Sequence, residues 1–110
     1  MNNPRTYSRH GREALALLGK QIRLGRKQRR WSELELAERA GIARATLQKI
    51  EKGDPGSSIG LVFEVAVLVG VPLFKPELPD LVRERERVDD KLALLPKAVR
   101  AIPKAVDDAF

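Results

Sequence analysis

The first regular feature of the chain is a helical spacing of apolar residues near its N-terminus. Leu15, Leu18 and Ile22 recur at intervals of three and four residues, while basic residues such as Lys20 and Arg23 fall on the other faces. This period places the three apolar side chains on one side of a helix. The pattern predicts a helix from Glu13 to residue 29 or 30, preceded by a flexible basic arm over residues 1–12.

Two shorter helices are predicted next. Ser32 followed by two early glutamates is typical of an N-cap with acidic residues in the first helical turn. The second helix should run from Glu33 to Ala40 and end at Gly41, because glycine readily takes left-handed backbone. A third helix should begin near Ala43 and end at Gly53, before an Asp-Pro-Gly turn.

Residues 58–71 are rich in apolar and β-branched side chains, and this pattern alone fits either a buried strand or a helix. No other segment offers a partner strand, so we interpret the segment as a helix. It would carry two adjacent apolar stripes: Ile59, Val62, Ala66 and Val69, and beside them Leu61, Val65 and Leu68. One stripe suffices for the core of a small domain, so we predict that the second forms a homodimer interface.

Prolines at positions 72, 76 and 79 interrupt the chain before its last helical segment. Asp80 is expected to cap a helix that ends near Leu92, supported by the ion pairs Arg85–Asp89 and Glu84–Arg87. The rest of the chain contains two further prolines and is expected to be extended and irregular. The sequence therefore predicts an all-α protein, with a domain at residues 13–75 and a C-terminal helix with a partner-binding tail at residues 76–110.

Composition excludes several classes of site. Among its 110 residues the chain has no cysteine and a single histidine, His10. This excludes disulfides and thiolate zinc sites and leaves no convincing Ser-His-Asp set, so we expect neither a metal nor another cofactor. No apolar run approaches a membrane span and no signal-peptide pattern is present, which favours a cytoplasmic protein without membrane contact.

The charge is unevenly distributed. The net charge is +6, yet residues 1–31 contain nine lysines and arginines against one glutamate. Such a basic segment favours a polyanionic partner, because each neutralised phosphate releases a condensed counterion. A solubilising arm explains the charge equally well.

The segment from Leu36 to Gly53 has the pattern of a helix-turn-helix. Ala37 permits a close helix crossing, Gly41 makes the turn, and Ile42 anchors both helices. The chain here resembles the Cro/cI-like, or XRE-type, family of DNA-binding domains over about residues 17–74. The resemblance implies a five-helix bundle like that of lambda repressor, which binds double-stranded operator DNA.

Carried over by position, the resemblance also implies roles for single residues. Arg26 should pair with Glu51 and tie the first helix to the third. Arg44 and Lys49 should read bases, Ala45 should meet a thymine methyl, and Thr46, Gln48 and Lys52 should contact phosphates, while the backbone amide of Glu33 binds another phosphate. Solvation is an equally good explanation for Gln48 and Lys52.

Two positions depart from the family pattern. The family usually has a glutamine where this chain has Glu33, and a carboxylate there should repel DNA phosphate. Ala43 stands where a serine or threonine usually caps the recognition helix, which costs about 1 kcal/mol of local stability. Both departures weaken the expectation of tight binding by a monomer.

A second likeness lies in the C-terminal half. The stretch from Glu51 to Phe74, the later LALLPKAVR and the terminal VDDAF look like HipB-type antitoxins, which partner HipA-like serine/threonine kinase toxins. The likeness implies a dimeric repressor of its own operon that docks on the kinase through Asp107, Asp108 and Phe110. A frayed terminus explains Phe110 equally well.

Three functions remain open. The leading one is a homodimeric repressor that neutralises a kinase toxin, and the alternative is an autonomous small repressor without a toxin. A protein-interaction adaptor on a degenerate helix-turn-helix is the third, slightly favoured by Glu33 and Ala43. An enzyme fits least, because the adjacent aspartates lie in charged segments and no glycine-rich phosphate loop is present.

Overall fold

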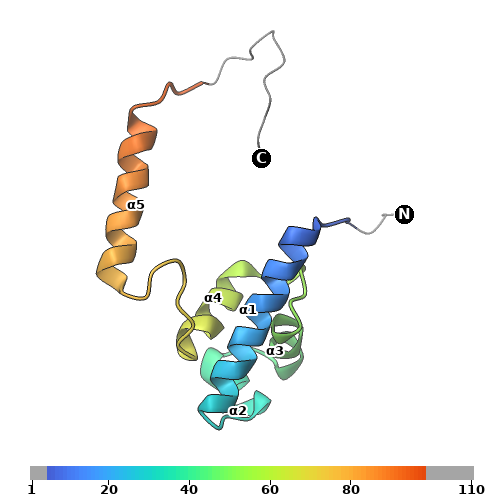
Figure 1. Ribbon diagram of the computed structural model, residues 1–110. Coiled ribbons are helices and arrows are strands. Elements are labelled where there is room, and N and C mark those ends of the chain that lie inside the picture. The colour runs from blue at the N-terminus through green and yellow to red at the C-terminus, as the bar shows by residue number, and fades with distance from the viewer. Residues whose placement is uncertain (1–4, 99–110) are drawn as a thin grey trace. The chain divides into compact units, whose positions relative to one another are not determined.

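The computed structural model describes residues 5–98, which form five α-helices and no named strand (Figure 1). The helices are α1 (Arg9–Gln28), α2 (Glu33–Ala40), α3 (Arg44–Glu51), α4 (Ile59–Leu68) and α5 (Leu78–Ala93). The all-α prediction is confirmed for this part of the chain. The chain divides into two compact units, residues 1–76 with α1–α4 and residues 77–110 with α5.

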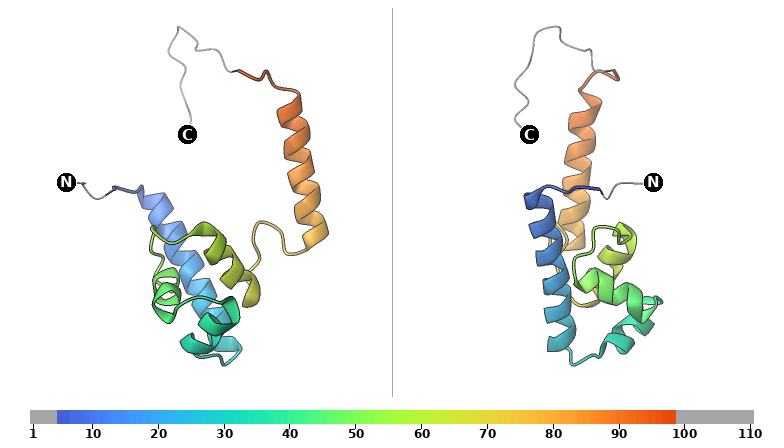
Figure 2. Two further views of the ribbon diagram at one scale, coloured as in Figure 1. Left: turned by 180° about the vertical axis from the view of Figure 1, so that it is seen from behind. Right: turned by 90° about the vertical axis from the view of Figure 1, so that its right-hand side faces the viewer.

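In the first unit, α1 is the longest helix and the three shorter helices lie on one side of it (Figure 2, right). It contacts α3 and α4, and α2 also contacts both of them. The core between these helices consists of eight buried residues, Ile22, Leu36, Ala37, Leu47, Ile50, Val65, Ala66 and Val69. Every one of the four helices contributes to it, so the core is complete only when all four are packed together.

Local signals set most of the helix ends. The Ser32 side chain accepts a hydrogen bond from the Glu35 amide, and the Glu35 side chain accepts one from the Ser32 amide, which completes a capping box. α2 ends at Gly41, whose φ of 69° is left-handed backbone that glycine takes without strain. The α2 boundaries predicted from the sequence are confirmed.

The predicted start of α1 is wrong. Ser8 caps this helix by accepting a hydrogen bond from the Gly11 amide at 3.0 Å, so α1 begins at Arg9 rather than Glu13. Residues 9–12 contain no apolar side chain, so apolar periodicity does not mark them as helical. They are helical because a capped first turn, exposed to solvent, needs no apolar face.

The second unit is described by its single helix. α5 begins after Glu77 with Pro79 in its first turn, so Asp80 is a first-turn residue and not the predicted cap. The expected ion pairs Arg85–Asp89 and Glu84–Arg87 are present, with N–O distances of 2.7 and 2.6 Å. None of the residues of α5 is buried.

Candidate nucleic-acid interface

The turn between α2 and α3 fixes the angle at which α3 leaves the domain. Across it the Ile42 amide donates a hydrogen bond to the Ala37 carbonyl oxygen at 2.9 Å. Leu36 and Leu47 are fully buried on either side of the turn, which packs the two helices against each other. α3 is therefore held rigidly on its inner face, and its outer face is left uncovered within the first unit.

The outer face of α3 carries the residues expected to contact DNA. Arg44, Ala45 and Lys49 are exposed, Thr46 and Gln48 are half-buried, and Lys52 is exposed just beyond the helix. The structure thus places these six residues along one short helix and its end. Ala43 precedes the helix without any side-chain cap, as its lack of a polar group requires.

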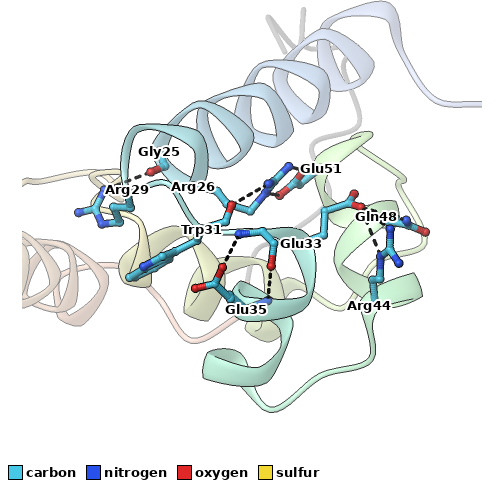
Figure 3. A network of polar contacts seen from close by, with 10 residues as sticks. Gly25, Arg26, Arg29, Trp31, Glu33, Glu35, Arg44, Gln48 and Glu51 are labelled. Carbon is cyan, nitrogen blue, oxygen red and sulfur yellow. Dashed lines mark hydrogen bonds and ion pairs between the residues drawn. The ribbon is translucent and has the colours of Figure 1, made fainter.

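Glu33 has a role that the sequence did not reveal. Its Oε1 accepts hydrogen bonds from Nε and Nη2 of Arg44, at 3.3 and 3.1 Å, and from Nε2 of Gln48 at 3.3 Å (Figure 3). These bonds, first that from Gln48 and then that from Arg44, lower the pKa of Glu33. The first residue of α2 therefore stays ionised and holds two side chains of α3.

The guanidinium of Arg44 keeps part of its donor set free. Glu33 uses the Nε–H and one Nη2 hydrogen, and a guanidinium has five N–H donors in a planar fork. The two Nη1 hydrogens and the second Nη2 hydrogen remain on the outer edge. This edge has the bidentate geometry that matches O6 and N7 of a guanine.

A buried ion pair joins α1 to the end of α3. Arg26 donates from Nε to Oε2 of Glu51 at 2.7 Å and from Nη2 to Oε1 at 3.1 Å. Its Nη1 donates to the Trp31 carbonyl oxygen at 3.0 Å, so the guanidinium also fixes the chain between α1 and α2. The hydrogen bond to Glu51 raises the pKa of Arg26, which keeps this buried group charged. The structure brings together the pair that the family resemblance implied.

Two other arginines make contacts within the fold. Arg29 donates to the Val69 carbonyl oxygen at 2.6 Å, which ties α1 to the end of α4. The guanidinium of Arg39 lies 4.2 Å from the centre of the Trp31 ring, a cation–π arrangement. The sequence could not predict the Arg29 contact, because its two partners lie 40 positions apart and leave no local signal.

An open depression lies beside the Glu33 network. It is lined by Arg23 of α1, Glu33 of α2, and Gln48, Glu51 and Lys52 at the end of α3. Arg23 and Lys52 supply two cations at its wall, from elements 29 positions apart in the sequence. Sequence reasoning did not single out Arg23, because only the crossing of α1 with α3 brings it to this surface.

The predicted dimer stripe on α4 is wrong at Val65. This residue is fully buried and Leu68 is half-buried against the core, whereas Leu61 is exposed, at 37%. The boundary between the two apolar stripes of α4 faces α1 and α2. Residues of both stripes are therefore buried. Its most exposed apolar residues are instead Ile59 and Val67, at 69% and 62% exposure.

Three further expectations from the sequence concern a kinase partner, metal ions and the membrane. Asp107, Asp108 and Phe110, expected to dock on a kinase, lie outside the described residues. Within residues 5–98, no three histidine or acidic side chains gather closely enough to hold a metal ion. In that same range, no helix has both the length and the apolar character needed to cross a membrane.

Comparison with known proteins gives one match. Residues 22–75 match the family described as Helix-turn-helix, a span that includes α2, α3, α4 and the last turns of α1. No curated protein and no solved structure matches the chain significantly.

Proposed function

We propose a specific role for the protein, and it starts from one premise. Residues 22–75 are an XRE-type helix-turn-helix domain, so the protein is a DNA-binding transcription regulator. The protein acts as a homodimeric repressor that reads its operator with α3 and serves as the antitoxin of a HipA-like serine/threonine kinase. Its contribution is binding alone, with no catalytic step and no cofactor.

The observation that carries the sequence-specific part is the state of Arg44. Its guanidinium is held on one edge by Glu33 and makes no hydrogen bond on the other within the described part of the first unit, where the outer face of α3 is also uncovered. A side chain already held in position loses less conformational entropy when it binds a base. Arg44 therefore supports guanine recognition in a major groove, with Lys49 one turn further along the helix.

Affinity has a separate source. Arg23 and Lys52 line the depression beside α3, where phosphates of the DNA backbone would lie if α3 enters the groove. The excess of basic residues within positions 1–31 adds to the electrostatic attraction. Glu33 opposes this attraction, because its carboxylate lies on the same surface and stays ionised.

The antitoxin part is supported by the sequence likeness described above. The acidic and aromatic end of the chain combines Asp107 and Asp108, which suit basic groups, with Phe110, which has apolar area to bury on a partner. Two dimer-related recognition helices would bind half-sites about 34–36 Å apart on a palindromic operator.

The DNA-binding proposal is tested by selecting preferred duplexes from a randomised library with the full-length protein. Binding of the selected duplex and of random DNA is then measured for Arg44→Ala and for Arg83→Ala, a matched loss of an exposed arginine on α5. We expect Arg44→Ala to lose about 5- to 150-fold in discrimination, and Arg83→Ala to retain it. An equal loss on both duplexes would show that Arg44 only adds charge.

Glu33→Gln tests the positioning of Arg44 in the same assay. Removing the carboxylate should raise affinity for random DNA, because a repulsive charge is gone, and should reduce discrimination, because Arg44 is less restrained. Glu38→Gln, an exposed charge loss on the same helix, is the control and should change discrimination little. If the two variants behave alike, Glu33 has no special role.

The antitoxin proposal is tested by affinity capture from the native host. Tagged full-length protein is compared with a truncation after residue 79 and with a full-length variant carrying Asp107→Asn, Asp108→Asn and Phe110→Ala. A stoichiometric kinase retained only by the unmodified chain is the expected result. Recovery of DNA and self-association alone would favour an autonomous repressor.

A further inference from the structure

α5 and the turn after it carry a seam of mostly apolar residues, none of which is buried within residues 5–98. Six positions follow the alternating three- and four-residue spacing of a coiled coil: Leu78, Leu81, Arg85, Val88, Leu92 and Leu95. The last of them, Leu95, lies just beyond the end of α5, in a turn whose Leu95 amide donates to the Leu92 carbonyl oxygen at 3.1 Å. We call this set the α5 seam. Five of its six residues are apolar, and Leu78, Leu92 and Leu95 are each at least 60% exposed.

A second copy of α5 is the occupant that fits this seam, because the repeat that defines it is the repeat that packs helix against helix. Symmetry allows a homodimer to pair the two helices either parallel and in register or antiparallel about a two-fold axis. The charges on and beside the seam distinguish the two arrangements.

The parallel arrangement is unfavourable at two places. It sets Arg85 opposite Arg85 of the second copy, which puts two like charges into one layer of the interface. It also sets Glu84, which flanks the seam, against Asp89 of the second copy. These repulsions occur at the middle of the helix, where a shift of register cannot avoid them without losing apolar layers.

The antiparallel arrangement removes both conflicts. Arg85 then lies opposite Val88 of the second copy, Leu81 opposite Leu92, and Leu78 opposite Leu95, so all six seam positions are used. Glu84 of each copy faces Lys91 of the other, giving two attractive pairs. The guanidinium of Arg85 is already bonded to Asp89 in its own helix at 2.7 Å, so its stem can cover the seam while its charge is neutralised.

We propose that the protein dimerises through antiparallel pairing of α5 with α5 of a second copy, with Glu84 and Lys91 setting the orientation. The proposal deepens the homodimer part of the proposed function and rests on that part alone. It needs no DNA, no toxin and no contact through α4. The 16-residue helix spans about 24 Å and holds five of the six seam positions, and Leu95 follows in the turn after it.

Sedimentation equilibrium of the full-length protein without DNA measures the dimer dissociation constant and so tests whether the α5 seam is the dimer interface. Glu84→Lys turns both cross-helix pairs from attractive to repulsive, so the dimer dissociation constant should rise about tenfold. Adding Lys91→Glu to that variant restores the pairs in reversed sense and should recover most of the loss. Glu86→Lys, the same charge change on the outer face of α5, is the matched control for net charge and should leave dimerisation nearly unchanged. Circular dichroism of each variant controls for helix stability, because Glu84→Lys also removes the Glu84–Arg87 ion pair.

Cysteine cross-linking tests the orientation, since the natural chain contains no cysteine. The double variant Leu81→Cys and Leu92→Cys should form covalent dimers with a short bifunctional maleimide, because the two positions face each other in the antiparallel pair. Leu81→Cys alone should not, because in this arrangement the two copies of position 81 are far apart. Efficient cross-linking of the single variant would overturn the antiparallel pairing.

The remaining outcomes separate the two proposals. A dimer that is insensitive to Glu84→Lys overturns the α5 interface and points to the exposed residues of α4. A protein that is monomeric throughout the accessible concentration range overturns both the α5 interface and the homodimer. Sequence-specific DNA binding is measured independently, so it stands or fails on the Arg44 variants and not on these results.

Discussion

For the substitution Gly19→Ala, helix propensity and tertiary packing predict opposite changes in the free energy of unfolding. Gly19 lies inside α1, where alanine is favoured over glycine by about 1 kcal/mol. A Cβ at this position would lie 2.6 Å from the Glu51 carbonyl oxygen and 2.8 Å from the Ile50 carbonyl oxygen. Both distances are well inside van der Waals contact, and both atoms belong to the backbone at the end of α3.

The packing effect should prevail. A crowded side chain can rotate away, whereas these carbonyl groups move only if α1 and α3 separate, which also loosens Ile22 and Ile50 in the core between them. Overpacking of this kind costs about 1–3 kcal/mol. After the gain in helix propensity, we expect the free energy of unfolding to fall by up to about 2 kcal/mol, which lowers the melting temperature by up to roughly 8–16 °C.

Gly60→Ala is the matched control. Gly60 lies in α4 and a Cβ there would meet no atom within 4 Å, so only the propensity gain of up to about 1 kcal/mol remains. Urea unfolding, followed by the fluorescence of the single tryptophan, Trp31, and by circular dichroism, measures both variants. If Gly19→Ala proved as stable as Gly60→Ala, the close crossing of α1 and α3 would be refuted.

Three further predictions concern single side chains. Glu51→Ala should lower the free energy of unfolding by about 3–5 kcal/mol, because it leaves the guanidinium of its partner buried and unpaired; a loss below about 1 kcal/mol in urea unfolding would contradict this. Ala43→Ser should raise that free energy by about 1 kcal/mol, because α3 has no side-chain cap, and an unchanged urea midpoint would count against it. The pKa of Glu33 is lowered in the folded state by hydrogen bonds first from Gln48 and then from Arg44, so its contribution to stability is present at neutral pH and is lost as the pH falls through that lowered pKa. NMR of the Arg44 Nε–H signal should show this single acidic transition, and Glu33→Gln should abolish it.

The helix-turn-helix could be predicted from the sequence because its signals are local. A capping serine, a glycine in left-handed backbone and a three-to-four spacing of apolar residues act within a few positions of one another. The same reasoning found the ion pairs of α5, which span a single helical turn. The Arg26–Glu51 pair spans 25 positions and came from family resemblance, not from local pattern.

The orientation of α4 could not be predicted, for a physical reason. Its mostly apolar sequence, unlike an amphipathic one, does not mark which side faces the core. The orientation of α4 depends on its packing partners, which the periodicity of its own sequence does not reveal. The helices α1 and α2 cover Val65 and Ala66 and leave Val67 exposed. A helix of uniform hydrophobicity therefore needs its packing partners before its surface can be assigned.

Glu33 shows how a departure from a family pattern can be misjudged when it is assessed alone. Against DNA phosphate, a carboxylate at the start of α2 counts only as repulsion. Beside Arg44 and Gln48 it is an acceptor that bonds both side chains and fixes the edge that Arg44 presents. If α3 enters a major groove, the carboxylate of Glu33 lowers the affinity for every DNA sequence. The affinity falls least where a guanine meets the edge of Arg44 that Glu33 holds in position. The excess of basic charge near the N-terminus can then restore affinity without restoring binding to the wrong sites, because phosphate contacts add to all sequences alike.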